Sequence, residues 1–400
     1  MFTSLFLRGP ALAALFALLG ACSPVDAPPL DQQLYVWQRQ WTAAHDEALA
    51  HTRDDFSTLR VLALQAFPGD GWRRARVEGA LLKRDGRPLI AVIRLDGQLP
   101  ALDSQDITAH IQQLLADWQA LGLNVTGVEI DHDAGNARLA GYGAFLQGLR
   151  ASLPPRLKLS ITALPAWLAS PDLPALLHSV DSSVLQVHAV SRPELGLFDP
   201  AQAKTWAAGW SRVTDKPFYL ALPAYGVGLL TSGSGAPLVE SEVPLERPGQ
   251  RRELMADPVQ LAALAAQLRQ APPAHLAGLI WFRLPLAGDR RAWSLATLRA
   301  VARGDALHSP LQLHLSERAG LYDIRLGNDG NLDSPLPERL ELAVGECEAV
   351  DALAGYAVQR NPGQLVFTRL QQGRLPAGAS RAIGWARCTK IDQGASHVRL

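Results

Sequence analysis

Eight short apolar runs alternate with amphipathic stretches over residues 32–304, and this alternation is the strongest constraint on the fold. The runs predict strands at 34–41, 59–67, 89–96, 125–133, 157–164, 183–189, 217–225 and 277–284. Helical spacing of apolar residues predicts helices at 107–121, 139–153, 201–213, 258–270 and 292–302. Eight strands that alternate with helices are typical of a (β/α)₈ barrel. The competing fold, a doubly wound open sheet, would more often carry a Gly-rich phosphate turn after the first strand, and none follows residue 41.

Residues 305–400 have a different pattern. Short alternating runs such as LQLHLSER and ERLELAVG are separated by Gly, Asn, Asp and Pro, and no convincing helical period is present. This pattern predicts a small all-β, sandwich-like accessory domain. The predicted division is therefore a signal peptide at 1–21, a tether at 22–31, a barrel at 32–304 and the β domain at 305–400.

The N-terminus has the order of a bacterial secretory signal. Arg8 precedes an apolar run at 11–19, which is too short to span a bilayer, and the run ends in the motif LGAC. This motif resembles a lipobox, so we expect cleavage before Cys22 and a lipid on that residue. Ser23 resembles the pattern of lipoproteins sent to the outer membrane, which predicts a membrane anchor on the periplasmic face. The alternative is an ordinary signal peptide with an incidental cysteine.

Apart from Cys22, the chain contains only two cysteines, Cys347 and Cys388. In an exported protein they can form a disulfide, and the alternative is two separate buried thiols. Neither has the neighbouring Cys or His that a zinc site needs. The formal net charge is zero, so the composition argues against nucleic-acid binding and suggests no acidic partner.

Three carboxylic residues alternate with apolar residues and a histidine at the end of the fourth predicted strand. They are Glu129, Asp131 and Asp133 in TGVEIDHDAG, residues 126–135. Side chains two apart in a strand share a face, so the three carboxyl groups would form one row, with His132 on the opposite face. Close like charges raise one another's pKa, which is one way to obtain a proton donor near neutral pH. The alternatives are a buried ion-pair network and a divalent cation held by the same oxygens.

Strand parity predicts which other side chains face the barrel interior. The set with aliphatic residues turned outward comprises Tyr35, Trp37, Arg39, Gln65, Phe67, Arg94, Asp96, Ser160, Thr162, Gln186, His188, Tyr219, Tyr225, Trp281 and Arg283. Substrate-binding roles are predicted for Trp37, Arg94, Asp96, Gln186, His188, Tyr225, Trp281 and Arg283. Aromatic rings can stack on the apolar faces of sugars, and arginines can pair with the acidic row. The segment 226–255 has no clear period and is predicted to be a lid, a subsite wall or an insertion without a role.

Motifs of other enzyme classes are absent from the sequence. It contains no Gly-x-Ser-x-Gly elbow, no phosphate-binding Gly-rich loop and no His-Glu-x-x-His helix. We therefore expect no cofactor and no resident metal.

The motif GVEIDHDA on the fourth strand resembles the D-G-x-D-x-D-x-E signature of the chitinase-like glycoside hydrolases of family eighteen, which are (β/α)₈ barrels. SITALPAW on the next strand is also similar. More closely, the stretch from 34 to 303, with YVWQRQW, GVEIDHDA, SITALPAWL and GLIWFRLP, resembles a bacterial family labelled domain of unknown function 3142.

The resemblance implies roles for the acidic row. Asp133 stands where the chitinases have their acid Glu, Asp131 where they have the Asp that orients the sugar's acetamide, and Glu129 where they have a supporting Asp. A mechanism assisted by that acetamide needs no separate protein nucleophile. This sequence departs from the chitinases at three places: Thr126 replaces the first acidic residue of the signature, the acid is Asp in place of Glu, and the sixth strand has Gln186 and His188 where the chitinases place a Tyr that contacts the acetamide. Chitin itself is therefore not the expected substrate.

The leading hypothesis is an envelope lipoprotein that hydrolyses, or transglycosylates, a bacterial polysaccharide. The alternative is a non-catalytic lipoprotein on a degenerate barrel that binds carbohydrate or serves in envelope assembly.

Overall fold

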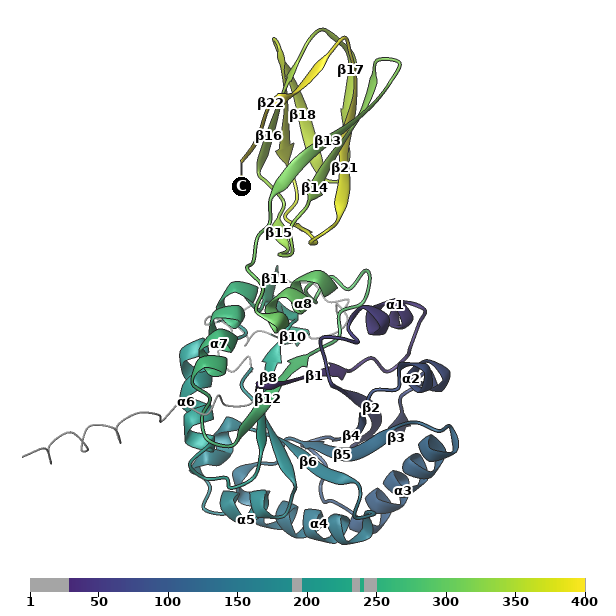
Figure 1. Cartoon of the computed structure of the whole chain (residues 1–400), viewed down its shortest axis with the longest axis vertical. Helices are drawn as coiled ribbons and strands as arrows, with labels where there is room; N and C mark the ends of the chain where they lie inside the picture. Colours follow the sequence, from purple (N-terminus) through teal and green to yellow (C-terminus); the bar gives the residue numbers. More distant parts are fainter. Residues whose placement is uncertain (1–28, 189–195, 232–237, 241–249, 400) are drawn as a thin grey trace, which may run out of the picture.

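The computed structural model of the chain describes residues 29–188, 196–231, 238–240 and 250–399 (Figure 1). Eight parallel strands form a closed barrel, because β1 pairs with both β12 and β2. The strands are β1 (Asp31–Val36), β2 (Thr58–Phe67), β4 (Leu89–Leu95), β5 (Val125–His132), β6 (Lys158–Ala163), β7 (Ser182–Gln186), β8 (Phe218–Pro223) and β12 (Leu276–Phe282). The predicted barrel is thus confirmed. The signal sequence and Cys22 lie outside the described residues.

Eight α-helices surround the barrel. They are α1 (Ala44–His51), α2 (Gly79–Asp85), α3 (Ser104–Ala120), α4 (Leu139–Ser152), α5 (Leu173–His178), α6 (Pro200–Trp210), α7 (Pro258–Gln270) and α8 (Leu295–Arg303), within the described ranges. Two 3₁₀ turns lie at Asn136–Arg138 and Pro165–Ala169. Side-chain caps fix several helix starts: Asp103, Asp199 and Asp257 each accept backbone N–H groups of the first turn. In the part of the chain with assigned structure, no helix combines the length and apolar composition needed to cross a membrane.

The barrel has two apolar layers. The larger layer lies between the strands and the helices and includes Leu34, Ile130 and Trp281. The smaller one fills the barrel interior around Tyr35 and Ile280. These layers hold the strands at fixed positions, so the polar side chains at the strand ends are presented on a rigid frame.

Strand β2 contains an irregularity that affects the site. Its register with β4 shifts between Leu62 and Leu64, so one residue is added to β2 without a partner. A bulge of this kind reverses which residues face inward. Arg60 therefore faces inward before the bulge, and Gln65 faces inward after it.

Two small antiparallel additions were not predicted. Strand β3 (Gly71–Arg74) pairs with the end of β2 as a hairpin. Strands β9 (Gly226–Thr231), β10 (Leu238–Glu240) and β11 (Gln250–Met255) form a three-stranded sheet in the order β10-β9-β11. The prediction of a long loop at 226–255 was therefore wrong for the described residues of this segment, which form three paired strands although the sequence shows no clear period.

The C-terminal region consists of antiparallel sheets, as predicted, with their own apolar core. The strands are β13 (Leu311–Arg318), β14 (Leu321–Asn328), β15 (Ser334–Pro335), β16 (Arg339–Val344), β17 (Cys347–Ala352), β18 (Tyr356–Asn361), β19 (Gln364–Arg369), β20 (Arg374–Leu375), β21 (Ser380–Cys388) and β22 (Ile391–Arg399). Figure 1 shows these sheets extending away from the barrel beyond α8. A disulfide joins Cys347 on β17 to Cys388 on β21.

Hydrogen bonds connect the two regions. The Asp333 carboxylate, in the turn before β15, accepts the backbone N–H of Ser294 at 2.8 Å and the Thr297 hydroxyl at 3.1 Å. Arg374 donates to the carbonyl of Ala292 at 2.6 Å. These bonds join the start of α8 to the turn before β15, and the residues just before α8 to β20.

Candidate active site

The acidic row lies where β5 ends. Glu129 and Asp131 face the barrel interior and are fully buried, whereas Asp133 follows the last residue of the strand and its side chain is 35% exposed. His132 points to the opposite face, where its ring contacts Tyr142 and burial lowers its pKa. Among the three carboxyl groups, the outermost is therefore the one that a ligand can reach from solvent.

Glu129 is fixed from three sides. The Tyr35 hydroxyl donates to its Oε1 at 2.5 Å, the Arg60 guanidinium donates to its Oε2, and the Ser160 hydroxyl lies 3.3 Å from Oε2. Burial raises the pKa of the Glu129 carboxyl, and the positive charge of Arg60 opposes that rise. A carboxyl group with so many partners is held in one position and is inaccessible to a large substrate.

Arg94 on β4 joins the other two carboxylates. Its two terminal nitrogens donate to Asp131 and to Asp133, each at 2.7 Å, and Asp131 also accepts the Thr162 hydroxyl at 2.6 Å. Burial disfavours the charge on Arg94, but the two carboxylates outweigh it and raise the Arg94 pKa above its ordinary value. The guanidinium thus sets the spacing between a buried and a partly exposed carboxylate.

An aromatic cluster lies across the barrel interior from β5 and reaches its mouth. The Phe282 ring contacts the rings of Trp37 at 5.1 Å, Tyr225 at 5.3 Å and His188 at 5.6 Å. The Tyr225 hydroxyl lies 3.3 Å from Nδ1 of His188. Such rings can stack on the C–H faces of a sugar.

His188 and Tyr225 are both strongly affected by burial. Burial lowers the pKa of His188 to about 4, so its imidazole is neutral near pH 7. Burial also raises the pKa of Tyr225 to about 12, with Arg283 opposing the rise. Nε2 of His188 is buried and has no hydrogen-bond partner among the described residues.

The prediction that Trp281 faces the barrel interior was wrong. Trp281 is 0% exposed, packs in the outer layer against Trp293 and donates from Nε1 to Gln32 at 2.8 Å. The predicted strand extended to residue 284, so Arg283 was taken as an inward-facing residue and Trp281, two residues earlier, was assigned to the same face. In the structure β12 ends at Phe282, before Arg283. Ile280 and Phe282 are the inward residues of β12, so Phe282 replaces Trp281 as the aromatic residue beside the site.

The remaining predicted binding residues lie near strand ends but outside the acidic row. Arg283 pairs with Asp289 at 2.9 Å, and Asp96 accepts the backbone N–H of Gln98 at 2.8 Å. Gln186 ends β7 and is partly exposed. None of these three side chains makes a described contact with the acidic row.

Sequence reasoning missed Arg60. Its side chain is 1% exposed, donates to Gln33 at 2.8 Å as well as to Glu129, and lies over the Tyr219 ring. Strict alternation counted back from Gln65, which was predicted to face inward, predicts that Arg60 faces outward. The bulge in β2 reverses this alternation, and it cannot be recognised in the sequence. An arginine within the apolar run LRVLALQAF was the available signal, since a buried cation needs a carboxylate partner.

The described residues contain no group of three or more His, Cys, Asp or Glu side chains arranged to hold a metal ion. The positive charges beside the acidic row are instead the guanidinium groups of Arg60 and Arg94.

Comparison with known proteins gives two family matches. Residues 85–287 match the model described as domain of unknown function (DUF3142), and residues 311–389 match a second one, domain of unknown function (DUF8456). No curated protein matches the chain.

Solved structures share the fold at low sequence identity. A chitinase from Bacteroides thetaiotaomicron is 12% identical with a TM-score of 0.50, over 69% of this chain and 97% of that one. The spore cortex-lytic enzyme SleL from Bacillus cereus is 12% identical with a TM-score of 0.49, over 69% and 74%. A chitinase from Chromobacterium violaceum is 14% identical with a TM-score of 0.47, over 69% and 98%. The match to the Bacteroides thetaiotaomicron chitinase shows that the barrel has a glycoside hydrolase-like fold.

Proposed function

The chain belongs to the family described as domain of unknown function (DUF3142), and from that premise we propose that it is an exported glycoside hydrolase, or transglycosylase, that acts on a bacterial polysaccharide. A fold alone does not establish an activity, so the proposal rests on the site. The main supporting observation is the difference in burial along the acidic row: Glu129 and Asp131 are buried and fixed, whereas Asp133 is partly exposed to solvent.

In this proposal Asp133 is the general acid. It donates a proton to the glycosidic oxygen as the bond from that oxygen to the sugar carbon breaks, and it then accepts a proton from the incoming water or sugar hydroxyl. Asp131, fixed by Arg94 and Thr162, stabilises positive charge on the sugar or orients a neighbouring group of it. Glu129 acts indirectly, because it holds Tyr35 and Arg60 behind Asp131.

The aromatic cluster supplies the sugar-binding surface. Phe282 and Trp37 offer rings for stacking, and the neutral His188 with Tyr225 offers hydrogen bonds to hydroxyl groups. Arg283, Asp96 and Gln186 are proposed to contact sugar units further along the polymer.

We also propose that the protein is a lipoprotein anchored to the outer membrane through Cys22. The signal pattern before Cys22 and the Ser at position 23 support this placement. The disulfide between Cys347 and Cys388 agrees with an oxidising compartment such as the periplasm.

One observation favours the second candidate function, a non-catalytic protein that binds carbohydrate or serves in envelope assembly. All three carboxylates of the row are ion-paired, Glu129 with Arg60, and Asp131 and Asp133 with Arg94. A fully paired row is also what a structural network requires.

The experiment is an assay of a soluble form that begins at Pro24 on a panel of envelope polysaccharides and exopolysaccharides, beside Asp133→Asn. The hydrolase predicts products from the wild type and none from the variant. Binding without products in both forms would support the second candidate. Identical products from both forms would exclude Asp133 as the acid.

A further inference from the structure

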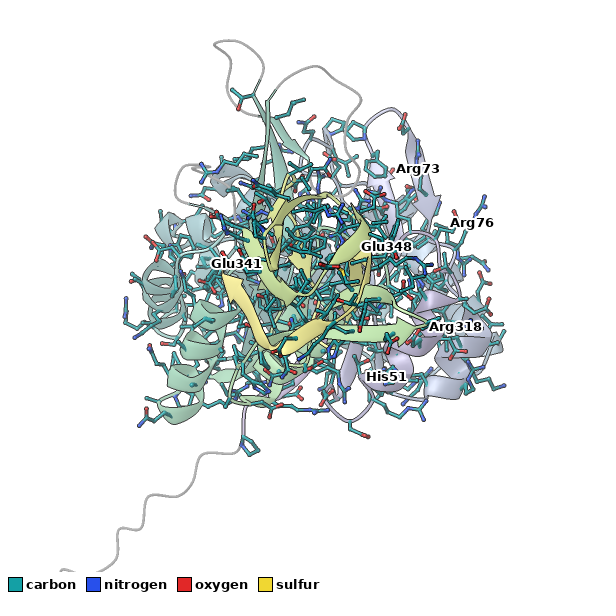
Figure 2. All side chains as sticks on the ribbon, turned by 90° about the horizontal axis from the view of Figure 1, so that it is seen from above. His51, Arg73, Arg76, Arg318, Glu341 and Glu348 are labelled. Carbon is teal, nitrogen blue, oxygen red and sulfur yellow. A yellow bond between two sulfur atoms is a disulfide. The ribbon has the colours of Figure 1, made fainter. Side chains whose placement is uncertain are left out.

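A basic pocket lies at the rim of the barrel, where β1 and β2 end. It has a volume of about 200 Å³, and its wall includes Arg39, Gln65, two arginines of β3, Arg73 and Arg74, and Arg76, which follows β3 and bridges to Gln40. Figure 2 shows Arg73 and Arg76 on the same side of the molecule. The proposed hydrolysis uses none of these arginines.

The charged residues that line this pocket are all positive. Four guanidinium groups line it and no lining residue is acidic, although the whole chain has a formal net charge of zero. Composition alone suggested no acidic partner, because a sum over the chain hides a local cluster of one sign. A concave site lined by one sign of charge concentrates ligands of the opposite sign.

Carboxylates outside the pocket partly compensate the charges of Arg73 and Arg74. Arg73 pairs with Asp70 at 3.0 Å and Arg74 pairs with Asp117, all at exposed positions where ion pairs are weak. The Arg76 side chain is exposed and has no hydrogen-bond or ion-pair partner among the described residues. Arg76 is therefore the guanidinium that an incoming anion can engage without breaking an existing pair.

The pocket adjoins the acidic row. Nε of Arg39 donates to Gln65 at 2.7 Å, and Gln65 is aligned with Arg94 across the β2–β4 pairing. Arg94 in turn contacts Asp133. A polymer bound over Asp133 at the end of β5 can therefore place a neighbouring unit in the pocket, with β4 lying between the two.

We propose that this pocket binds an oxyanion carried by the polysaccharide, a carboxylate or a phosphate on a sugar next to the bond at Asp133. The inference rests on the proposed function and narrows its substrate class to acidic glycans. Guanidinium groups suit both oxyanions, because their planar donors bind two oxygens at once.

The test measures binding by the full chain, purified in detergent, of a galacturonate hexasaccharide and of its fully methyl-esterified form. The two ligands share a backbone and differ in charge. The acidic form should bind at least about tenfold more tightly, and the difference should shrink at high salt. The same binding measurement with phosphorylated and neutral mannan tests phosphate. The series with the larger difference in affinity identifies the oxyanion that the pocket binds.

The matched variants are Arg76→Gln and Arg318→Gln. Both remove one exposed arginine, but Arg318 lies on β13, outside the barrel. Arg76→Gln should weaken binding of the acidic ligand about tenfold and leave the neutral ligand unaffected, whereas Arg318→Gln should change neither. Equal binding of charged and neutral ligands in both series, or equal effects of the two variants, would overturn the proposal.

Product release, followed in the same samples and in Asp133→Asn, separates this inference from the proposed function. Charge-dependent binding without products in any sample would reject the hydrolase and keep the pocket. Products from neutral glycans that are unaffected by Arg76→Gln would keep the hydrolase and reject the pocket.

Discussion

Arg60 and Glu129 form an ion pair inside the barrel, with both side chains at most 1% exposed. This pair brings two charges into an apolar interior, where each depends on the other. It also supports the site, since Glu129 on β5 accepts the Tyr35 hydroxyl from β1 across the barrel interior.

The first prediction concerns this pair. Arg60→Met leaves the Glu129 carboxyl buried without its counter-charge and should lower the free energy of unfolding by about 3–5 kcal/mol. Urea unfolding followed by circular dichroism measures the loss. The double variant Arg60→Met with Glu129→Gln should recover part of it, and a double variant as unstable as the single one would contradict the pairing argument.

A second prediction separates Trp281 from Phe282. Trp281→Ala removes a buried ring from the outer layer, so it should cost about 3–5 kcal/mol of stability and leave glycan affinity unchanged in the folded protein. Phe282→Ala should weaken glycan binding severalfold, because Phe282 is the central ring of the aromatic cluster. Calorimetry measures glycan binding by both variants, and thermal unfolding measures their stability. Weaker glycan binding in Trp281→Ala and unchanged binding in Phe282→Ala would show that Trp281, not Phe282, contacts the glycan.

A third prediction follows from His188, whose pKa is lowered to about 4 by burial. The unfolded chain protonates this imidazole near its ordinary pKa of about 6.5, so the folded state is progressively disfavoured as pH falls from about 6.5 to about 4. Over that interval the wild type should lose roughly 3 kcal/mol more stability than His188→Gln, and nothing further below it. Unfolding curves at several pH values test this, and parallel losses in the two proteins would refute it.

The fourth prediction concerns the disulfide. Cys347 and Cys388 are 41 residues apart in the sequence, and a cross-link over a loop of that length stabilises by roughly 4 kcal/mol through the entropy of the unfolded chain. Reduction, or the double change Cys347→Ser with Cys388→Ser, should lower the melting temperature of the C-terminal sheets. Near-ultraviolet circular dichroism of the barrel tryptophans provides the control. An unchanged melting temperature would show that these sheets do not need the cross-link.

The acidic row and Arg94 could be predicted from the sequence, whereas Arg60 could not. The acidic row was predictable because β5 is regular from Gly127 onward, so the period of two holds from Glu129 to Asp133. Arg94 was predictable for the same reason on β4. Arg60 was not, since the bulge in β2 reverses parity and is set by packing against the neighbouring strands.

Trp281 shows a second limit of sequence reasoning. On β12 (LAGLIWF) both the inward and the outward residues are apolar, so composition cannot distinguish the faces. The sheet of β9, β10 and β11 shows a third limit, because its pairing depends on contacts between residues far apart in sequence. The rim pocket likewise depends on the hairpin of β3, which brings its arginines next to Arg39.

The most direct test of the central claim is the initial rate of reducing-end release from an active polysaccharide by the wild type, Asp133→Asn and Asp323→Asn. Asp323 is an exposed carboxylate on β14 and controls for the loss of one negative charge. The account predicts that Asp133→Asn reduces the rate at least about a hundredfold while its stability is maintained, and that Asp323→Asn retains the wild-type rate. A wild-type rate in Asp133→Asn would contradict it.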